Sequence, residues 1–174
     1  MTRKAAETGP GAMVLVAIEQ GFPKSERILI DPLAGPILPL KSRISVGMCL
    51  PIRDWIVAKA EVKVPGLWGS MMARKRYIDD VVAEAADGQV EAIVNLGAGF
   101  DTRAFRLPGL QSFPAWEVDQ PATIHCKRRR LQSVMGEVPA HVTLVPVDFD
   151  RDDLATVLAA SGYPRSATTV FIWE

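Results

Sequence analysis

Hydrophobic and polar positions change their spacing along the chain, and the change is clearest in the C-terminal half. Short apolar runs there stop at a glycine or an acidic residue and predict buried strands. Segments 121–135 and 150–160 have helical spacing, and Pro121 and Asp150 suit helix starts. This alternation indicates an α/β fold whose mostly parallel sheet has flanking helices. The runs predicted as strands are 90–96, 115–118, 142–147 and 168–173.

The N-terminal part of the chain has helical spacing without strands. We expect one structural domain with two regions, an N-terminal helical lid over residues 1–69 and a Rossmann-like unit over residues 70–174. The helices expected before the first strand are 12–20, a short one from Asp31, one near 54–60 in the otherwise irregular stretch 40–69, and 70–86.

The helix over 70–86 carries an apolar stripe that should face the core. Arg74 lies one turn before Ile78 and should share that inward face. A buried arginine needs an acidic partner. The partner is either a carboxylate of a neighbouring loop or the carboxylate of a bound ligand. The stripe consists of Ile78, Val81, Val82 and Ala85.

The first three predicted strands all end in residues suited to ligand binding. The first stops at Gly97 and Gly99, the second at Asp119 and the third at Asp148. In a parallel sheet these ends share one edge, where α/β proteins bind their ligands. Bare glycine backbone lets a ligand approach closely, and an acid after the second strand can accept hydrogen bonds from ribose hydroxyls.

The glycine turn does not complete a dinucleotide fingerprint. The third glycine of G-x-G-x-x-G is replaced by Thr102, and Asp101 directly follows the turn. Both features favour a nucleoside ligand without phosphates, of which S-adenosylmethionine is the common example. A nucleotide-dependent oxidoreductase is the less favoured alternative.

Charge and cysteine usage narrow the possible partners. Twenty basic residues balance twenty acidic ones, which argues against a nucleic-acid or anionic-membrane partner. The basic run 127–130 is expected to form a solvated helix face, and no histidine or cysteine has metal-ligand spacing. Cys49 and Cys126 form neither a disulfide framework nor a CxxC motif, which favours a cytoplasmic location.

Several motifs together resemble the leucine carboxyl methyltransferase family. Residues 95–107 (NLGAGFDTRAFRL) resemble its signature, and residues 116–121 (WEVDQP) resemble its second motif. Residues 147–149 (VDF) and 172–174 (IWE) resemble its third and fourth motifs, and the resemblance extends over residues 12–174. It implies a Rossmann-like class I methyltransferase fold and S-adenosyl-L-methionine as cofactor.

The resemblance also implies individual roles. Arg74 would pair with the methionine carboxylate of the cofactor, and Glu174 would lie near its amino group. Gly97 and Gly99 would let the cofactor pass, and Asp119 would hold the ribose hydroxyls.

Two residues after the third strand are implied to hold the adenine. Asp148 would accept a hydrogen bond from the adenine amino group, and Phe149 would flank the ring. The complete set of expected cofactor-binding residues is Arg74, Gly97, Ala98, Gly99, Asp119, Asp148, Phe149 and Glu174.

The implied activity is an S-adenosylmethionine-dependent O-methyltransferase that acts on a carboxylate or hydroxyl of a small molecule or peptide C-terminus. No residue stands out as a general base, which favours a carboxylate acceptor, because a carboxylate is already ionised at neutral pH. The catalytic residues and the acceptor are not identified from the sequence.

The resembling fold has seven strands, and only four are expected in this chain, with the fourth beside the first. The C-terminal strands are therefore expected to be missing, and residues 170–173 are expected to leave an apolar edge open to self-association. An inactive fragment that retains cofactor or partner binding is the alternative.

Overall fold

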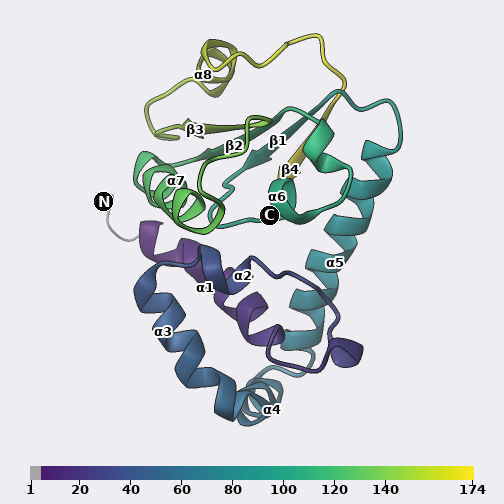
Figure 1. Ribbon diagram of the computed structural model, residues 1–174, viewed down its shortest axis with the longest axis vertical. Helices are drawn as coiled ribbons and strands as arrows, with labels where there is room; N and C mark the ends of the chain where they lie inside the picture. Colours follow the sequence, from purple (N-terminus) through teal and green to yellow (C-terminus); the bar gives the residue numbers. More distant parts are fainter. Residues whose placement is uncertain (1–4) are drawn as a thin grey trace.

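The computed structural model describes residues 5–174 and contains one four-stranded parallel sheet (Figure 1). The strand order is β3-β2-β1-β4, so the fourth strand lies beside the first, as expected. The α/β fold with a parallel sheet and flanking helices is thereby confirmed. The strands are β1 (Ala92–Leu96), β2 (Ala115–Asp119), β3 (Val142–Pro146) and β4 (Thr169–Trp173).

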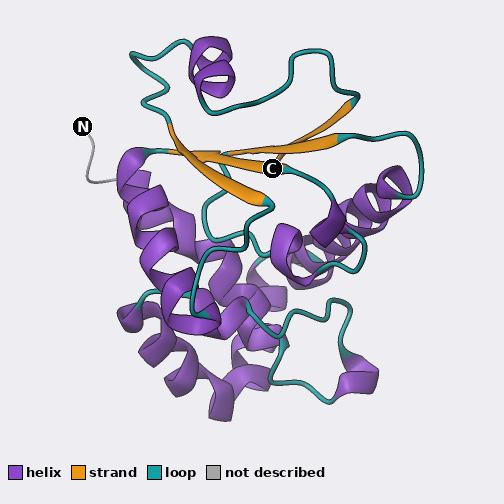
Figure 2. Cartoon of the chain, turned by 45° about the horizontal axis from the view of Figure 1, so that its top comes forward, coloured by secondary structure: helices purple, strands orange, loops and turns teal. Residues whose placement is uncertain are grey.

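Side chains that alternate along β1 enter two separate cores, because successive residues of a strand point to opposite faces. Ala92 and Val94 join the smaller core under α8 (Leu154–Ala160). Ile93 joins the larger core, which the N-terminal helices, α5 (Leu67–Ala86) and α7 (Pro121–Met135) complete. Figure 2 shows α8 above the strands and the larger helical layer below them.

The helices before and between the strands form that larger layer. A 3-10 turn at Lys24–Glu26 follows the first helix, another at Leu50–Ile52 joins the third to the fourth, and a third lies at Leu110–Ser112. The helices are α1 (Ala5–Glu19), α2 (Ala34–Ile37), α3 (Leu40–Cys49), α4 (Arg53–Lys63), α5 (Leu67–Ala86), α6 (Arg103–Arg106) and α7 (Pro121–Met135).

The helix expected near residues 54–60 is confirmed as α4, but the rest of the stretch 40–69 was wrongly expected to be irregular, because α3 occupies residues 40–49. The two helices bury little: Val46 is the buried residue of α3, and none of the residues of α4 is buried. The sequence of α3 therefore lacks the apolar stripe by which an amphipathic helix is found. Pro39 precedes α3, and Pro51 lies in the 3-10 turn that joins the two helices.

Helix α5 presents only part of the expected face to the core: Val82 is buried and Ile78 packs against the core, as expected, but the other inward positions differ. Lys75 and Asp79 are buried, whereas Arg74 is exposed and Val81 is 41% exposed. The inward charges are tolerated because they are paired with side chains of α6 and the chain end. Because Lys75 and Asp79 lie on the inward face of α5, the apolar residues of the sequence did not define that face correctly.

The N-terminal region is fastened to α5 by a buried hydrogen bond. The indole Nε1 of Trp68 donates to Glu19 Oε2 at 2.8 Å, and the amide of Ile28 donates to Glu19 Oε1 at 2.8 Å. Across residues 5–174, none of the helices combines the length and the apolar composition that crossing a membrane requires.

Helix α8 starts later than its sequence suggested. Asp153 rather than Asp150 caps it and accepts a hydrogen bond from the amide of Thr156 at 2.8 Å. The earlier acids form a turn instead: the amide of Asp150 donates to Asp148, and the amide of Asp148 donates to Asp152.

Candidate functional site

A cavity of about 310 Å³ opens at the carboxyl ends of β1 and β2. It contains six of the eight residues expected to bind a cofactor, drawn from α5, two strand ends and the chain end. In Figure 1 this chain end, marked C, lies between α6 and α7 and above α1. The lining residues are Ala12, Met13, Arg74, Lys75, Asn95, Gly97, Ala98, Gly99, Phe100, Asp101, Asp119, Thr123 and Glu174.

The glycine turn forms one wall of the cavity. Gly97 has φ +66°, a left-handed conformation that residues with a Cβ rarely adopt. A Cβ built at Gly97 would meet nothing within 4 Å, so the space beside the bare backbone is open. The turn is held to β2 because the amide of Ala98 donates to the Val118 carbonyl at 3.0 Å.

Asp119 connects the turn to the end of β2. Its Oδ2 accepts from the amide of Gly99 at 2.7 Å, and its Oδ1 accepts from the amide of Gln120 at 2.6 Å. Each carboxylate oxygen has a second lone pair, so the side chain can still accept from a ligand hydroxyl. The backbone contacts fix the carboxylate where it faces the cavity.

The other end of the cavity is strongly polar. Glu174 Oε1 lies 3.0 Å from Arg74 Nη2 and 3.1 Å from Lys75 Nζ, and Glu174 Oε2 lies 3.2 Å from Arg103 Nη1. Although burial alone would raise the pKa of Glu174, Lys75 and Arg103 hold it below its usual value. A carboxylate therefore stands among three cations at this end.

Lys75 was missed as a site residue from the sequence. It lies beside Arg74, and the apolar periodicity placed it on the outer face of the helix. In the structure its side chain is 8% exposed, whereas that of Arg74 is 55% exposed. The available signal was the presence of adjacent cations on a helix that leads to the glycine turn.

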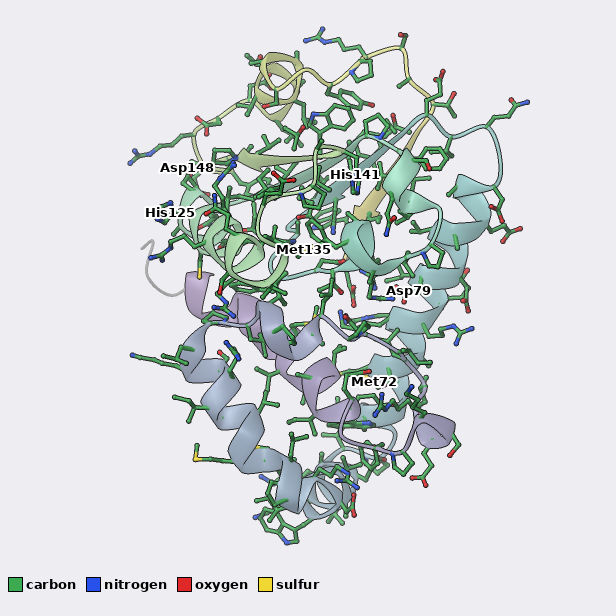
Figure 3. The ribbon with its side chains drawn as sticks, viewed as in Figure 1. Met72, Asp79, His125, Met135, His141 and Asp148 are labelled. Atoms are coloured by element: carbon green, nitrogen blue, oxygen red, sulfur yellow. The ribbon has the colours of Figure 1, made fainter. Side chains whose placement is uncertain are left out.

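A buried network of ion pairs next to the cavity joins α5 to α6. Arg103 Nε lies 2.7 Å from Asp79, Arg106 Nη2 lies 2.6 Å from the other oxygen of Asp79, and Arg103 also pairs with Asp101. Burial opposes ionisation of Asp101, but Arg103 and Lys127 hold its pKa below the usual value. Figure 3 shows Asp79 on α5, close to α6.

The N-terminal region reaches this network through Asp31. Its carboxylate lies 3.2 Å from Arg106 Nε and accepts a hydrogen bond from the hydroxyl of Thr102. Burial raises the pKa of Asp31, and Arg106 opposes the shift. Since α1 also lends Ala12 and Met13 to the cavity wall, the N-terminal region adjoins the site directly.

Asp148 and Phe149 lie outside the cavity, although Asp148 follows β3 at the same sheet edge. The Asp148 carboxylate accepts from the amide of Asp150 at 3.2 Å, and Phe149 is 46% exposed. In Figure 3 Asp148 lies on the opposite side of the molecule from Asp79. Their roles toward an adenine ring stay predictions.

The expected solvated face over 127–130 was wrong for Lys127. Its Nζ lies 2.7 Å from Glu117 Oε2, and the two side chains are 0% and 1% exposed. Arg128 and Arg129 do face solvent. A lysine at the start of a basic run shows no sign in the sequence of being buried. The available signal was Glu117, a charged residue within a buried strand that needs a basic partner.

Comparison with known proteins gives consistent matches over nearly the whole chain. The family model described as leucine carboxyl methyltransferase matches residues 11–174. A protein of Mycolicibacterium paratuberculosis is 33% identical over 170 residues, which cover 92% of this chain and 52% of the relative. A protein of Mycobacterium avium is 30% identical over 177 residues, which cover 98% of this chain and 57% of the relative. Both relatives are named as S-adenosyl-L-methionine-dependent methyltransferases, and the chain spans about half their length.

Proposed function

The chain belongs to the leucine carboxyl methyltransferase family, and from that premise we propose that it is an S-adenosyl-L-methionine-dependent O-methyltransferase whose cofactor site is the cavity at the ends of β1 and β2. The observation that carries the proposal is the meeting of a bare glycine turn, Asp119 and a polar charged end in one cavity. These are the features that a nucleoside joined to an amino acid requires.

The charged end suits the amino-acid part of the cofactor. An α-amino acid carries a carboxylate and an ammonium group on neighbouring atoms. Arg74 and Lys75 carry two positive charges, and Glu174 carries one negative charge. Glu174 Oε1 lies 3.0 Å from Arg74 Nη2 and 3.1 Å from Lys75 Nζ. The surplus cation can receive the carboxylate, while Glu174 can accept hydrogen bonds from the ammonium group.

The opposite wall suits a ribose without phosphates. Asp119 would accept hydrogen bonds from the ribose hydroxyls, and the open backbone at Gly97 would allow the sugar to lie close. Thr102 is 1% exposed and is hydrogen bonded to Asp31, so this position does not offer the bare backbone of a third glycine. That arrangement supports a nucleoside over a dinucleotide.

We extend the proposal to the flanking residues and regions. Asp148 and Phe149 would hold the adenine from the end of β3. Residues 1–69 would act as a lid, because Ala12 and Met13 of α1 already line the cavity.

The bound cofactor would supply an activated methyl group, so the protein's own task is to align the acceptor and exclude water. Glu174 and Asp101 have pKa values held low, which makes both poor proton acceptors at neutral pH. Within the described residues that line the cavity there is no histidine. We therefore propose a carboxylate acceptor, which needs no general base.

Calorimetric titration with S-adenosylhomocysteine tests the cofactor assignment. We expect saturable binding at one site, and we expect no binding of NADH in a parallel fluorescence titration. A folded protein that shows no heat with S-adenosylhomocysteine at high concentration would refute the proposal.

The bond formed tests the acceptor class. The protein is incubated with a cell extract and with cofactor labelled on its methyl group, and the products are then treated with alkali. A methyl ester releases labelled methanol, whereas an ether retains its label. Release of methanol supports a carboxylate acceptor, and a label that resists alkali would contradict it.

We also propose that copies of the chain associate through β4. Within residues 5–174 this strand pairs only with β1, and Phe171 and Trp173 are 55% and 86% exposed. Light scattering after size exclusion should show a dimer that Trp173→Lys converts to monomer. A monomeric parent protein at high concentration would contradict this.

A further inference from the structure

Glu117 and Lys127 form an ion pair that is completely enclosed beneath the cofactor cavity. Glu117 lies on β2 and Lys127 on α7, with 2.7 Å between Oε2 and Nζ. Enclosing two charges costs more than burying apolar side chains of the same size, so a buried pair is weak evidence for a stabilising role. Its position relative to the cavity is more informative.

The ammonium group of Lys127 faces the glycine turn. Its Nζ lies 3.5 Å from the carbonyl oxygen of Ala98, the residue between the two turn glycines, and 5.6 Å from the centre of the Phe105 ring. The distance to the carbonyl is long for a hydrogen bond, so the attraction is chiefly electrostatic. The other side of the same turn is held by the Ala98 and Gly99 amides, which donate to β2.

We propose that Glu117 and Lys127 are positioning residues for the glycine turn, an inference that rests on the proposed cofactor site. Lys127 attracts the Ala98 carbonyl away from the cavity, and Glu117 fixes Lys127 in place. The turn backbone then presents Gly97 and Gly99 to the cofactor. Neither Glu117 nor Lys127 lines the cavity, so neither is assigned a contact with the cofactor.

The competing explanation is that the pair only holds α7 against the sheet. The double substitution Glu117→Met with Lys127→Met distinguishes the two explanations. Methionine has nearly the length of both side chains and leaves no charge stranded, so the fold can be kept while the attraction on the turn is lost. The matched control is Leu158→Ala, which weakens the core on the opposite face of the sheet.

The readouts are the dissociation constant of S-adenosylhomocysteine and the amide hydrogen exchange of Ala98 and Gly99. In the double variant we expect the dissociation constant to rise about tenfold, the effect of losing one charge-assisted contact, and the turn amides to exchange faster. Leu158→Ala should leave both readouts unchanged while it lowers the unfolding midpoint. Unchanged affinity and unchanged turn exchange in the folded double variant would overturn the proposal.

Single substitutions keep the test open if the double variant does not fold. Glu117→Gln keeps an oxygen that can hold the ammonium group beside Ala98, so affinity should stay within about threefold, whereas Lys127→Gln removes the ammonium group and should weaken affinity about tenfold. Equal effects of the two changes would refute the positioning role. If the parent protein binds no S-adenosylhomocysteine, the proposed function fails, and turn exchange alone then decides the present inference.

Discussion

Replacing Arg103 by methionine should destabilise the fold far more than replacing a surface arginine. Arg103 is 3% exposed in its side chain and pairs with Asp79 at 2.7 Å, with Asp101 and with Glu174 at 3.2 Å. Methionine removes the positive charge and leaves the buried carboxylate of Asp79 and the mostly buried carboxylates of Asp101 and Glu174 without this partner. Breaking a buried pair in this way costs about 3–5 kcal/mol. Since Asp79 keeps Arg106 at 2.6 Å, we expect the lower end, about 3 kcal/mol.

The assay is urea unfolding of Arg103→Met beside the control Arg76→Met. Arg76 pairs with Asp80 at 2.8 Å on the same helix, but both side chains are more than half exposed. That pair should contribute about 0.5 kcal/mol or less. If Arg103→Met lowers the free energy of unfolding by as little as the control does, the network beside the cavity is not a cooperative buried unit.

The pH dependence of that loss provides a second check. In the parent protein Arg103 helps to hold the pKa of Asp101 below 3.8, so the carboxylate adds stability that is lost only as the pH falls through that lowered value. Without Arg103, burial should raise the pKa of Asp101, and the contribution of its protonated form is then lost as the pH rises. The deficit of the variant should therefore be larger at pH 8 than at pH 5.

Three further substitutions test other parts of the account. Gly97→Ala should cost about 1–2 kcal/mol in thermal unfolding, since φ is +66°, and little loss would contradict the turn geometry. Trp68→Phe should cost about 1–3 kcal/mol in urea, because Glu19 Oε2 loses its indole donor at 2.8 Å; a neutral change would mean that water replaces it. Burial raises the pKa of Glu117 to about 7, although the charge of Lys127 acts to lower it. The protonated form of Glu117 therefore stabilises the fold at low pH, and that contribution is lost as the pH rises through about 7. Lys127→Met should raise this pKa further, and stability measured by urea should fall more steeply from pH 6 to pH 9 than in the parent; parallel profiles would contradict the pairing.

The parallel sheet could be predicted because its pattern is local. Each strand is a short apolar run that ends in a glycine or an acid, and the observed boundaries differ from the expected ones by at most two residues. The glycine turn and Asp119 were predicted for the same reason. A turn that requires left-handed backbone and an acid at a strand end are both visible in a few consecutive residues.

The charged interior could not be predicted because its pairs join residues far apart in the chain. Lys127 reads as part of a solvated basic run until Glu117 is placed opposite it by the packing of α7 on β2. Lys75 and Asp79 interrupt the apolar stripe of α5, and their partners Glu174 and Arg103 are brought near only by the fold. Helix α4 was expected near residues 54–60, whereas α3 was missed, since its exposure leaves little periodic apolar signal.

The most direct test of the central claim is the affinity for S-adenosylhomocysteine of Asp119→Asn and Asp153→Asn, measured by calorimetry. Asp119 lines the cavity, whereas Asp153 caps α8 away from it. Loss of a charged acceptor for the ribose should weaken binding at least about tenfold in Asp119→Asn. Asp153→Asn should bind as the parent protein does. Equal affinity of Asp119→Asn and the parent would contradict a cofactor site at the ends of β1 and β2.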